Sequence, residues 1–326
     1  MASERVVAFA GTAPFGAAIL DGLIDGCEGC AGRTVPLVIS QPDRPAGRGR
    51  KVSSPAVAVR ARERGLRLVQ PERTHDPEML ELYAELGINT IVVAAFGQMI
   101  REPLLTDMLM LNVHGSLLPA YRGAAPVERA IMDGCAESGV GIMQMEAGLD
   151  TGPVAYEARV PIDAEMDAGA LYAALAAAAI PLLHQAIDDA EAGTLSFNPQ
   201  PEDGASYAQK IVAADRVIDP RLGVRQVHDQ IRGLSPHIGA YLQLGDERLG
   251  VWKGTPAKDM PEGVQLDQPG MVWHDTSRLL IACGDGVLEL VDVQPQGKRR
   301  LPAADWLRGL RTPLAHATFP ESVTAP

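Results

Sequence analysis

The sequence has few cysteines, few aromatic residues and no hydrophobic run of membrane-spanning length. Four cysteines in 326 residues are too few for a disulfide framework. The longest apolar run, residues 170–183, is short and contains Pro181, so we expect a buried helix and no membrane partner. Aromatic residues make up only 4% of the chain, but 46% of it is hydrophobic, which is enough for a core. The start, Met-Ala-Ser-Glu-Arg, carries an acid and lacks the pattern of a signal peptide, so we expect a cytoplasmic protein.

Motifs for a metal or a nicotinamide cofactor are incomplete. Cys27-Glu-Gly-Cys30 has the spacing of a redox motif or of half a zinc site, but no second Cys or His pair follows at ligand distance. The glycines next to these cysteines predict a surface turn, and we expect no metal. Residues 11–16 do not form the G-x-G-x-x-G phosphate fingerprint, which argues against a nicotinamide cofactor.

Positive charge is scarce overall but is concentrated in one segment. The net charge is -12, which argues against indiscriminate nucleic-acid binding. Residues 44–67 nevertheless carry eight basic residues and a single acid, Glu63. Such a basic island in an acidic chain indicates one specific anionic partner. Its members are Arg44, Arg48, Arg50, Lys51, Arg60, Arg62, Arg64 and Arg67.

The first part of the chain alternates short apolar runs with helical patterns. Because alternating strands and helices build parallel sheets, the sequence predicts an α/β domain with a doubly wound, mostly parallel sheet. A helix from about residue 168 to residue 192 should cover this sheet. The predicted strands are residues 6–10, 37–40, 66–69, 90–95, 108–111, 140–145 and 154–160.

The composition changes at residues 193–204, where Gly, Asn, Pro, Glu and Asp dominate, as in a linker. A helix through Val224 and Leu234 and five short strands follow, a pattern that predicts an OB-like β-barrel. We therefore expect a first domain over residues 1–195, a linker over 196–214 and a barrel domain over 215–326. The predicted barrel strands are 240–244, 249–253, 270–273, 279–282 and 287–293, and a basic edge comprises Lys298, Arg299, Arg300, Arg308 and Arg311.

A polar segment follows the strand at residues 108–111. It runs Asn-Val-His-Gly-Ser-Leu-Leu-Pro-Ala-Tyr-Arg-Gly-Ala-Ala-Pro, from Asn112 to Pro126. If the strand continues through Asn112 and His114, their side chains leave the same face, at the sheet edge where such folds place chemistry. An amide beside an imidazole can stabilise an oxyanion, and the imidazole can donate or accept a proton. From these residues alone, the alternative is that Asn112 caps a turn and that His114 is a loop histidine whose hydrogen bonds are made within the protein.

This segment resembles the folate-dependent formyltransferases, and most closely the methionyl-tRNA formyltransferase family. The segments 142–145 (Ile-Met-Gln-Met) and 148–152 (Gly-Leu-Asp-Thr-Gly) match the same family in order and spacing, and the resemblance covers nearly the whole chain. It implies formyl transfer from 10-formyltetrahydrofolate to the amino group of methionyl-tRNA on initiator tRNA, without a metal. We expect a monomer. The chain departs from the family where Ala13 stands inside the usual Gly-Thr-Pro, and where Pro220 replaces a tryptophan.

The resemblance also implies roles for individual residues. Asn112 and protonated His114 would stabilise the oxyanion, and Asp150 would orient His114. An exposed, mobile loop carrying Arg48 would grip the acceptor end of the tRNA, together with Arg44, Arg50 and Lys51. The folate pocket would be lined by Phe96, Gly97, Ser116, Leu117, Leu118 and Pro119.

Other functions stay open at this point. An amino-sugar formyltransferase, or a hydrolase that releases formate from 10-formyltetrahydrofolate, would share the three catalytic residues but would have no need of the Arg48 loop. A tRNA-binding module without catalysis belongs to another class, and the intact set of Asn112, His114 and Asp150 argues against it. The basic loop could also be a solvated segment whose charge only aids solubility.

Overall fold

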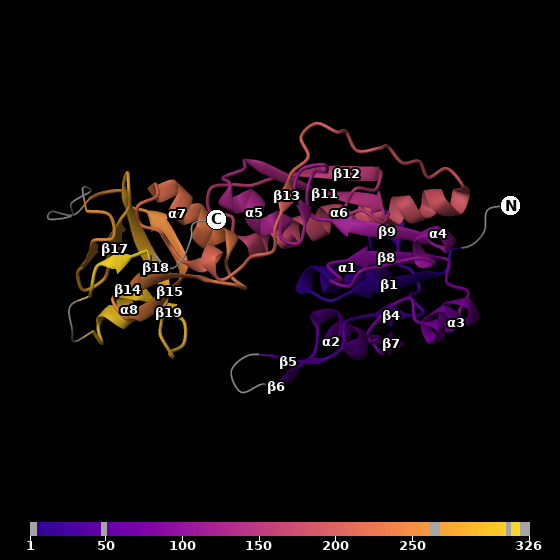
Figure 1. Cartoon of the computed structure of the whole chain (residues 1–326), viewed down its shortest axis with the longest axis horizontal. Coiled ribbons are helices and arrows are strands. Elements are labelled where there is room, and N and C mark those ends of the chain that lie inside the picture. Colours follow the sequence, from indigo (N-terminus) through magenta and orange to yellow (C-terminus); the bar gives the residue numbers. More distant parts are fainter. Residues whose placement is uncertain (1–4, 47–50, 261–267, 311–313, 320–326) are drawn as a thin grey trace. The chain divides into compact units, whose positions relative to one another are not determined.

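The computed structural model describes residues 5–46, 51–260, 268–310 and 314–319, and the chain forms two compact units (Figure 1). The first unit comprises Met1–Gly123, Ser138–Pro161 and Tyr172–Tyr207. The second comprises Ala124–Glu137, Ile162–Leu171 and Ala208–Pro326. Each unit is therefore assembled from segments that are distant in the sequence.

The first unit is built around a seven-stranded sheet, whose order β12-β11-β9-β8-β1-β4-β7 can be followed in Figure 1. The pairs β1–β4, β1–β8, β4–β7 and β8–β9 are parallel, and β11 runs antiparallel to β9. The predicted doubly wound, mostly parallel sheet is confirmed. The strands are β1 (Val7–Gly11), β4 (Val38–Ile39), β7 (Leu68–Val69), β8 (Thr90–Ala94), β9 (Leu109–His114), β11 (Glu137–Gln144) and β12 (Val154–Pro161).

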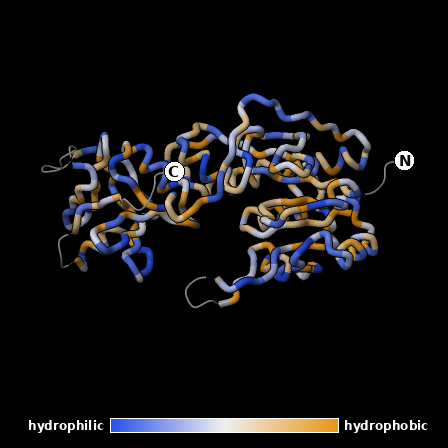
Figure 2. The backbone as a smooth tube through the Cα atoms, in the orientation of Figure 1, coloured by the Kyte–Doolittle hydropathy of each residue, from blue (hydrophilic) through white to orange (hydrophobic). Residues whose placement is uncertain are grey.

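Helices cover both faces of this sheet. On one face, Tyr83 of α3 and Leu104 of α4 share a buried cluster with Ala8 of β1. Because successive strand residues point to opposite faces, Phe9 faces the other side, where it lies near Val57 of α2. Figure 2 shows hydrophobic residues, in orange, along the strands of this unit. The helices are α1 (Pro14–Asp25), α2 (Ala56–Glu63), α3 (Pro77–Glu85), α4 (Leu104–Asp107) and α6 (Ala168–Ala192), which belongs to this unit from Tyr172 onward.

Helix α6 has 25 residues and is apolar enough, by length and composition alone, to cross a membrane. Its contacts are those of a helix in a globular core. Ile180 fills the space beside Gly22 of α1, and Nε2 of His184 lies 3.0 Å from the carbonyl oxygen of Gly22. The rings of Phe15 and Tyr172 lie 5.6 Å apart. These contacts fit the buried helix that the sequence predicts.

The strand order reverses next to β1. The chain leaves β1 toward β4 and β7, and then returns to β8 on the other side of β1. The carboxyl ends of β1 and β8 therefore form a topological switch point, where open α/β sheets bind ligands. The amides of Thr12 and Ala13 donate to the carbonyl oxygen of Ala95 at 3.1 and 3.3 Å, which ties the two loops together.

Short strands complete the first unit. β2 (Gly26–Cys27) and β3 (Cys30–Ala31) form a hairpin, in agreement with the turn that the sequence predicts, and a disulfide joins Cys27 to Cys30. The sequence analysis did not anticipate this local link. Cys283, in the second unit, is buried, and burial raises the pKa of its thiol to about 12. The other short strands are β5 (Arg44–Ala46), β6 (Lys51–Ser53), β10 (Arg122–Gly123) and β13 (Tyr207–Ala208).

Part of the basic island is neutralised within the first unit. Arg60 of α2 lies 3.0 Å from Asp21 of α1, and Arg64 lies 2.7 Å from Asp21 and 2.6 Å from Asp25. In the same way, Arg62 lies 3.3 Å from Asp43. Acids outside the segment therefore balance these three arginines, so part of the island's charge is used within the protein.

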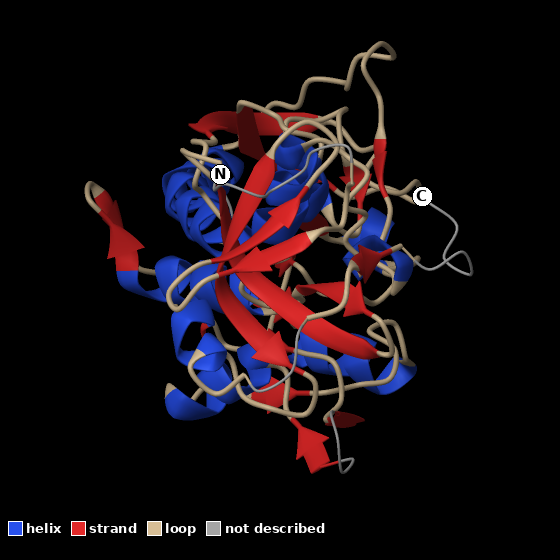
Figure 3. Cartoon of the chain, turned by 90° about the vertical axis from the view of Figure 1, so that its left-hand side faces the viewer, coloured by secondary structure: helices blue, strands red, loops and turns tan. Residues whose placement is uncertain are grey.

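The second unit contains an antiparallel sheet with the order β16-β17-β18-β15-β14-β20, and β19 pairs with β18 (red in Figure 3). All five predicted barrel strands are present. Residues 240–244 and 279–282 have the predicted bounds, and the other three strands have ends shifted by a few residues. The strands are β14 (Ala240–Leu244), β15 (Glu247–Pro256), β16 (Val272–His274), β17 (Leu279–Ala282), β18 (Val287–Pro295), β19 (Leu301–Pro302) and β20 (Ala317–Thr318).

Gly270 brings the two edges of this sheet together. Its amide donates to the carbonyl oxygen of Ala282 at 2.8 Å, and its own carbonyl oxygen accepts from the amide of Ala317 at 2.7 Å. A side chain does not fit here, because a Cβ would lie 2.1 Å from the Ala317 oxygen, and the φ of 93° favours glycine. The predicted OB-like β-barrel is confirmed as a nearly closed, barrel-like sheet.

Helices α5 and α7 pack together in the second unit, with Gly233 against Met132. Arg129 of α5 donates to both carboxylate oxygens of Asp215, at 3.0 and 2.7 Å. Residues 124–137 therefore group with the chain after residue 208, although they precede the predicted linker. The domain boundary at residue 195 stays a prediction. The helices of this unit are α5 (Pro126–Met132), η1 (Ala214–Arg216), α7 (Val224–Gly233) and α8 (Ala303–Leu307).

Candidate active site

Strand β9 carries the predicted catalytic pair. It extends through His114, so the side chains of Asn112 and His114 leave the same face of the sheet. Asn112 is 9% exposed and His114 is 6% exposed. Val93 of β8 and Gly141 of β11 are their respective strand partners, which fixes both backbones. Among the described residues, the side-chain amide of Asn112 has no hydrogen-bond partner and is free to meet a substrate.

Both ring nitrogens of His114 face protein oxygens. Nε2 lies 3.0 Å from the carbonyl oxygen of Tyr121, which can only accept, so Nε2 carries the hydrogen. Nδ1 lies 3.8 Å from Oδ2 of Asp150, too far for a hydrogen bond but close enough for attraction between charges. A second proton, on Nδ1, would point at this carboxylate. The two oxygens therefore fix the orientation of the His114 ring.

Asp150 lies in the loop between β11 and β12 and has a left-handed φ of 51°. Its Oδ2 accepts a hydrogen bond from the amide of Gly123 at 2.8 Å. The same oxygen therefore contacts the loop that follows His114 and lies beside the imidazole ring. Strand β9 and two loops of the first unit thus bring Asp150 and His114 together.

Replacing Gly152 with alanine should destabilise this loop. A Cβ at Gly152 would lie 1.8 Å from the carbonyl oxygen of Gln144, a backbone atom that cannot move without breaking the end of β11. We expect a loss of about 1–3 kcal/mol of unfolding free energy, measured by denaturant titration. Gly141→Ala is the control, since its Cβ would have only ordinary contacts, the nearest at 3.7 Å. Equal stability of the two variants would contradict this description of the loop.

The predicted folate-pocket residues lie on two loops that follow β8 and β9. Phe96 is 3% exposed and packs in the core cluster with Tyr83 and Leu104, and Leu118 is 8% exposed. The side-chain amide of Gln41 donates to the carbonyl oxygen of Phe96 at 3.1 Å. Ser116 is buried and its hydroxyl donates to the Ala120 carbonyl oxygen at 2.6 Å, so it shapes its own loop. The remaining predicted members, Gly97, Leu117 and Pro119, lie in the same two loops.

The predicted tRNA-binding residues lie between β4 and α2. The described arms of this segment, β5 and β6, are paired antiparallel strands, where the sequence predicts an irregular loop. Arg44 is exposed, and its guanidinium lies 3.6 Å from the carboxylate of Glu72. Lys51 is the first residue of β6. Arg48 and Arg50 lie outside the described residues.

Sequence reasoning missed the residues that hold the site loops in place. The hydroxyl of Ser206 accepts from the amide of Tyr121 at 2.9 Å, and its carbonyl oxygen accepts from the amide of Arg122 at 2.9 Å. Gln200 contacts the loop of Asp150. Gln200 and Ser206 belong to the predicted linker, whose polar composition gave no signal of such contacts.

Two family models match the chain. The model described as Formyl transferase matches residues 4–187, which include Asn112, His114 and Asp150. The model described as Formyl transferase, C-terminal domain, matches residues 210–311. The chain belongs to the formyl transferase family. It is therefore an enzyme that transfers a formyl group.

Relatives of this formyl transferase extend over nearly its whole length. A methionyl-tRNA formyltransferase from Rubrobacter xylanophilus is 46% identical over 93% of the chain and 96% of the relative. A methionyl-tRNA formyltransferase from Methylobacterium is 40% identical over 94% of the chain and 96% of the relative. A solved methionyl-tRNA formyltransferase from Clostridium thermocellum has the same fold, with a TM-score of 0.54 and 14% identity over 89% of this chain and 98% of the other. A solved N-formyltransferase from Helicobacter canadensis has a TM-score of 0.63 and 17% identity, and the match covers 89% of this chain and 99% of the other.

Proposed function

We propose that this enzyme transfers a formyl group from 10-formyltetrahydrofolate to the amino group of methionyl-tRNA on initiator tRNA. The observation that carries the proposal is the similarity to methionyl-tRNA formyltransferases over both the catalytic and the C-terminal parts of the chain, at 40 to 46% identity. The product would be formylmethionyl-tRNA for translation initiation, and we expect the enzyme to act in the cytoplasm as a monomer.

The side chains of the site suit this chemistry. 10-Formyltetrahydrofolate supplies the formyl group when it is bound. The amide of Asn112 and the cationic ring of His114 stabilise the negative charge that develops on the formyl oxygen, and one preorganised donor is worth about 3 kcal/mol. The amine attacks the formyl carbon and the folate nitrogen leaves. Asp150 lies 3.8 Å from Nδ1 of His114, where it orients the ring and can relay the proton that the amine releases to the departing folate nitrogen. The carbonyl oxygen of Tyr121 holds the other ring nitrogen and fixes the ring's orientation.

The residues near the switch point fit a flat folate ring. Phe96 and Leu118 supply buried apolar surface, and they lie on the loops that follow the neighbouring strands β8 and β9. The free amide of Asn112 can meet the formyl oxygen. Within the described residues, no group of three His, Cys, Asp or Glu side chains could hold a metal ion.

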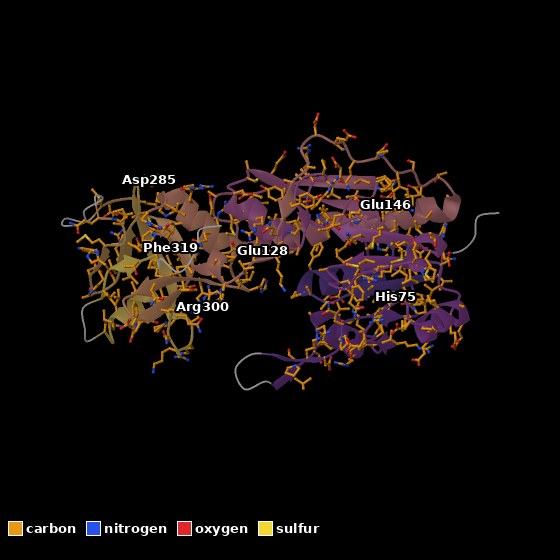
Figure 4. All side chains as sticks on the ribbon, in the orientation of Figure 1. His75, Glu128, Glu146, Asp285, Arg300 and Phe319 are labelled. Atoms are coloured by element: carbon orange, nitrogen blue, oxygen red, sulfur yellow. A yellow bond between two sulfur atoms is a disulfide. The ribbon has the colours of Figure 1, made fainter. Side chains whose placement is uncertain are left out.

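The proposed tRNA contacts lie on the Arg48 segment and on the basic edge of the second unit. Arg300, labelled in Figure 4, lies 2.8 Å from the carboxylate of Asp292, and Arg308 pairs with Asp305. Lys298 and Arg299 are exposed. We propose that residues 1–195 bind folate, that 196–214 link the domains and that 215–326 bind tRNA.

Replacing Arg48 with alanine should weaken formylation of methionyl-tRNA and leave the slow hydrolysis of 10-formyltetrahydrofolate intact. Log affinity falls as log salt concentration rises, and the loss of one phosphate contact should make this negative slope less steep by about 0.9. The defect is therefore largest at low salt. Arg64→Ala is the matched control, because Arg64 is already paired with Asp21 and Asp25. Equal losses in both reactions would mean that the loop shapes the active site instead of binding tRNA.

An amino-sugar formyltransferase is the second candidate, because solved enzymes of that kind share the fold. A side-by-side assay decides between them. The purified enzyme and 10-formyltetrahydrofolate are incubated with charged initiator tRNA, with uncharged tRNA or with a nucleotide-linked amino sugar. We expect a formylated product only with charged tRNA. Formylation of the sugar alone, or release of formate with no acceptor preference, would overturn the proposal.

A further inference from the structure

Gln200 lies at the centre of a hydrogen-bond network between the two catalytic loops. Its side-chain amide donates to the carbonyl oxygen of Asp150 at 2.8 Å and to that of Gly152 at 2.7 Å. Its side-chain oxygen accepts from Nε and Nη2 of Arg122, at 3.0 and 2.7 Å. Gln200 therefore connects the loop of Asp150 to the segment that follows His114 in the chain.

The hydrogen bonds from Gln200 hold a segment of backbone whose conformation is unfavourable. Asp150 has a φ of 51°, a left-handed conformation that is unfavourable for a residue with a side chain. The amide of Gln200 holds the carbonyl groups of Asp150 and Gly152, and so fixes the backbone just after the catalytic carboxylate. The carboxylate itself is held from the other side by the amide of Gly123. The direction of Asp150 is thus set by Gln200 and Gly123 together.

Arg122 determines which way the amide of Gln200 points. A guanidinium only donates, so the side-chain oxygen of Gln200 must face Arg122 and its NH2 group must face the two carbonyl oxygens. The backbone of Arg122 is held in turn, because its amide donates to the carbonyl oxygen of Ser206 at 2.9 Å. One orientation of Gln200 therefore satisfies every partner.

We infer that Gln200 is a positioning residue for formyl transfer, which holds Asp150 in the direction that keeps His114 oriented. The inference rests on the proposed roles of Asp150 and His114. It also assigns a catalytic purpose to part of a segment whose composition predicts only a linker.

Two substitutions separate the possible roles of Gln200. Gln200→Ala removes all four hydrogen bonds. Gln200→Glu keeps the size and the acceptor for Arg122, but it cannot donate and places negative charge against the carbonyl oxygens of Asp150 and Gly152. We expect both variants to lose kcat for formyl transfer about tenfold to 100-fold, with KM for methionyl-tRNA changed less than about twofold. Wild-type turnover by Gln200→Glu would show that only the contact with Arg122 matters and would overturn the inference.

A double-mutant cycle with Asp150→Ala tests whether Gln200 acts through Asp150. Once the carboxylate is absent, Gln200→Ala should cause no further loss of kcat, because the two residues belong to one unit. A purely structural role predicts instead that the two losses multiply and that the melting temperature falls in parallel with kcat. Glu202→Gln is the control, since Glu202 is exposed in the same segment and should leave kcat unchanged.

The same cycle distinguishes this inference from the proposed function. If the wild-type enzyme does not formylate methionyl-tRNA, the proposed substrate is wrong, and the cycle is then measured on hydrolysis of 10-formyltetrahydrofolate. Coupling between Gln200 and Asp150 in that reaction would still support the positioning role. Independent losses in either reaction would overturn it.

Discussion

Substitution of His114 with alanine should lower kcat for formyl transfer to methionyl-tRNA by about 100-fold to 1,000-fold. The ring is 6% exposed and lies between the carbonyl oxygen of Tyr121 and the carboxylate of Asp150. In the proposed mechanism, its removal takes away one group that stabilises the formyl oxygen and leaves Asp150 without its partner. Folate binding should change little, because the proposed folate-binding residues Phe96 and Leu118 remain. Steady-state kinetics and a folate binding titration measure the two effects separately.

His274→Ala is the control for this substitution, because His274 is exposed on β16 of the second unit. It should leave kcat unchanged. A His114→Ala enzyme that keeps kcat within about fivefold of wild type would remove His114 from the catalytic set.

Substitution of Asp229 with asparagine should destabilise the second unit by about 3–5 kcal/mol, because it leaves a buried arginine without its partner charge. Arg232 is 4% exposed and its Nε donates to Oδ1 of Asp229 at 2.7 Å. Its Nη1 donates to the Met166 carbonyl oxygen at 2.8 Å, and Arg225 donates to Oδ2 of Asp229 at 3.0 Å. Thermal and denaturant unfolding measure the loss.

Asp292→Asn is the matched control, since the pair of Asp292 and Arg300 is partly exposed and should contribute less than about 1 kcal/mol. Comparable losses of unfolding free energy in the two variants would mean that the burial of Arg232 does not determine how strongly Asp229→Asn destabilises the protein.

The contribution of Asp229 should also depend on pH. Burial would raise the pKa of its carboxyl group, but His228, Arg232 and Arg225 outweigh this and lower the pKa below the ordinary value of 3.8. A lowered pKa in the folded state means that the unfolded chain binds the proton first. The stabilisation is therefore complete above about pH 4 and is lost as the pH falls through the folded pKa. Wild type should lose more stability than Asp229→Asn on acidification.

Local patterns in the sequence predicted most of the fold. The apolar runs at β1, β8 and β9 are buried on both faces, so they are continuous and stand out from their surroundings. Helix α6 begins and ends at the predicted residues, because its composition contrasts sharply with the flanking polar segments. The barrel strands were found because turns separate them at short intervals. The condition for the catalytic pair, a strand continuing through Asn112 and His114, is also met.

Long-range contacts could not be predicted in the same way. Arg60 and Arg64 are balanced by acids of α1, and no spacing rule connects those positions. Gln200 lies in a polar segment whose local pattern is that of a linker, and only the folded chain brings it to Asp150. Such contacts depend on the path of the whole chain, which periodicity and composition do not encode.

The single-turnover rate of formyl transfer, with excess enzyme over charged initiator tRNA, tests the central claim most directly. The comparison is between wild type and Asn112→Ala, because the amide of Asn112 has no partner among the described residues and its removal should disturb little else. We expect wild type to formylate the methionyl-tRNA, and the variant to do so about 100-fold to 1,000-fold more slowly while it binds folate with similar affinity. A wild-type rate in the variant, or no formylmethionyl-tRNA from wild type, would contradict the account.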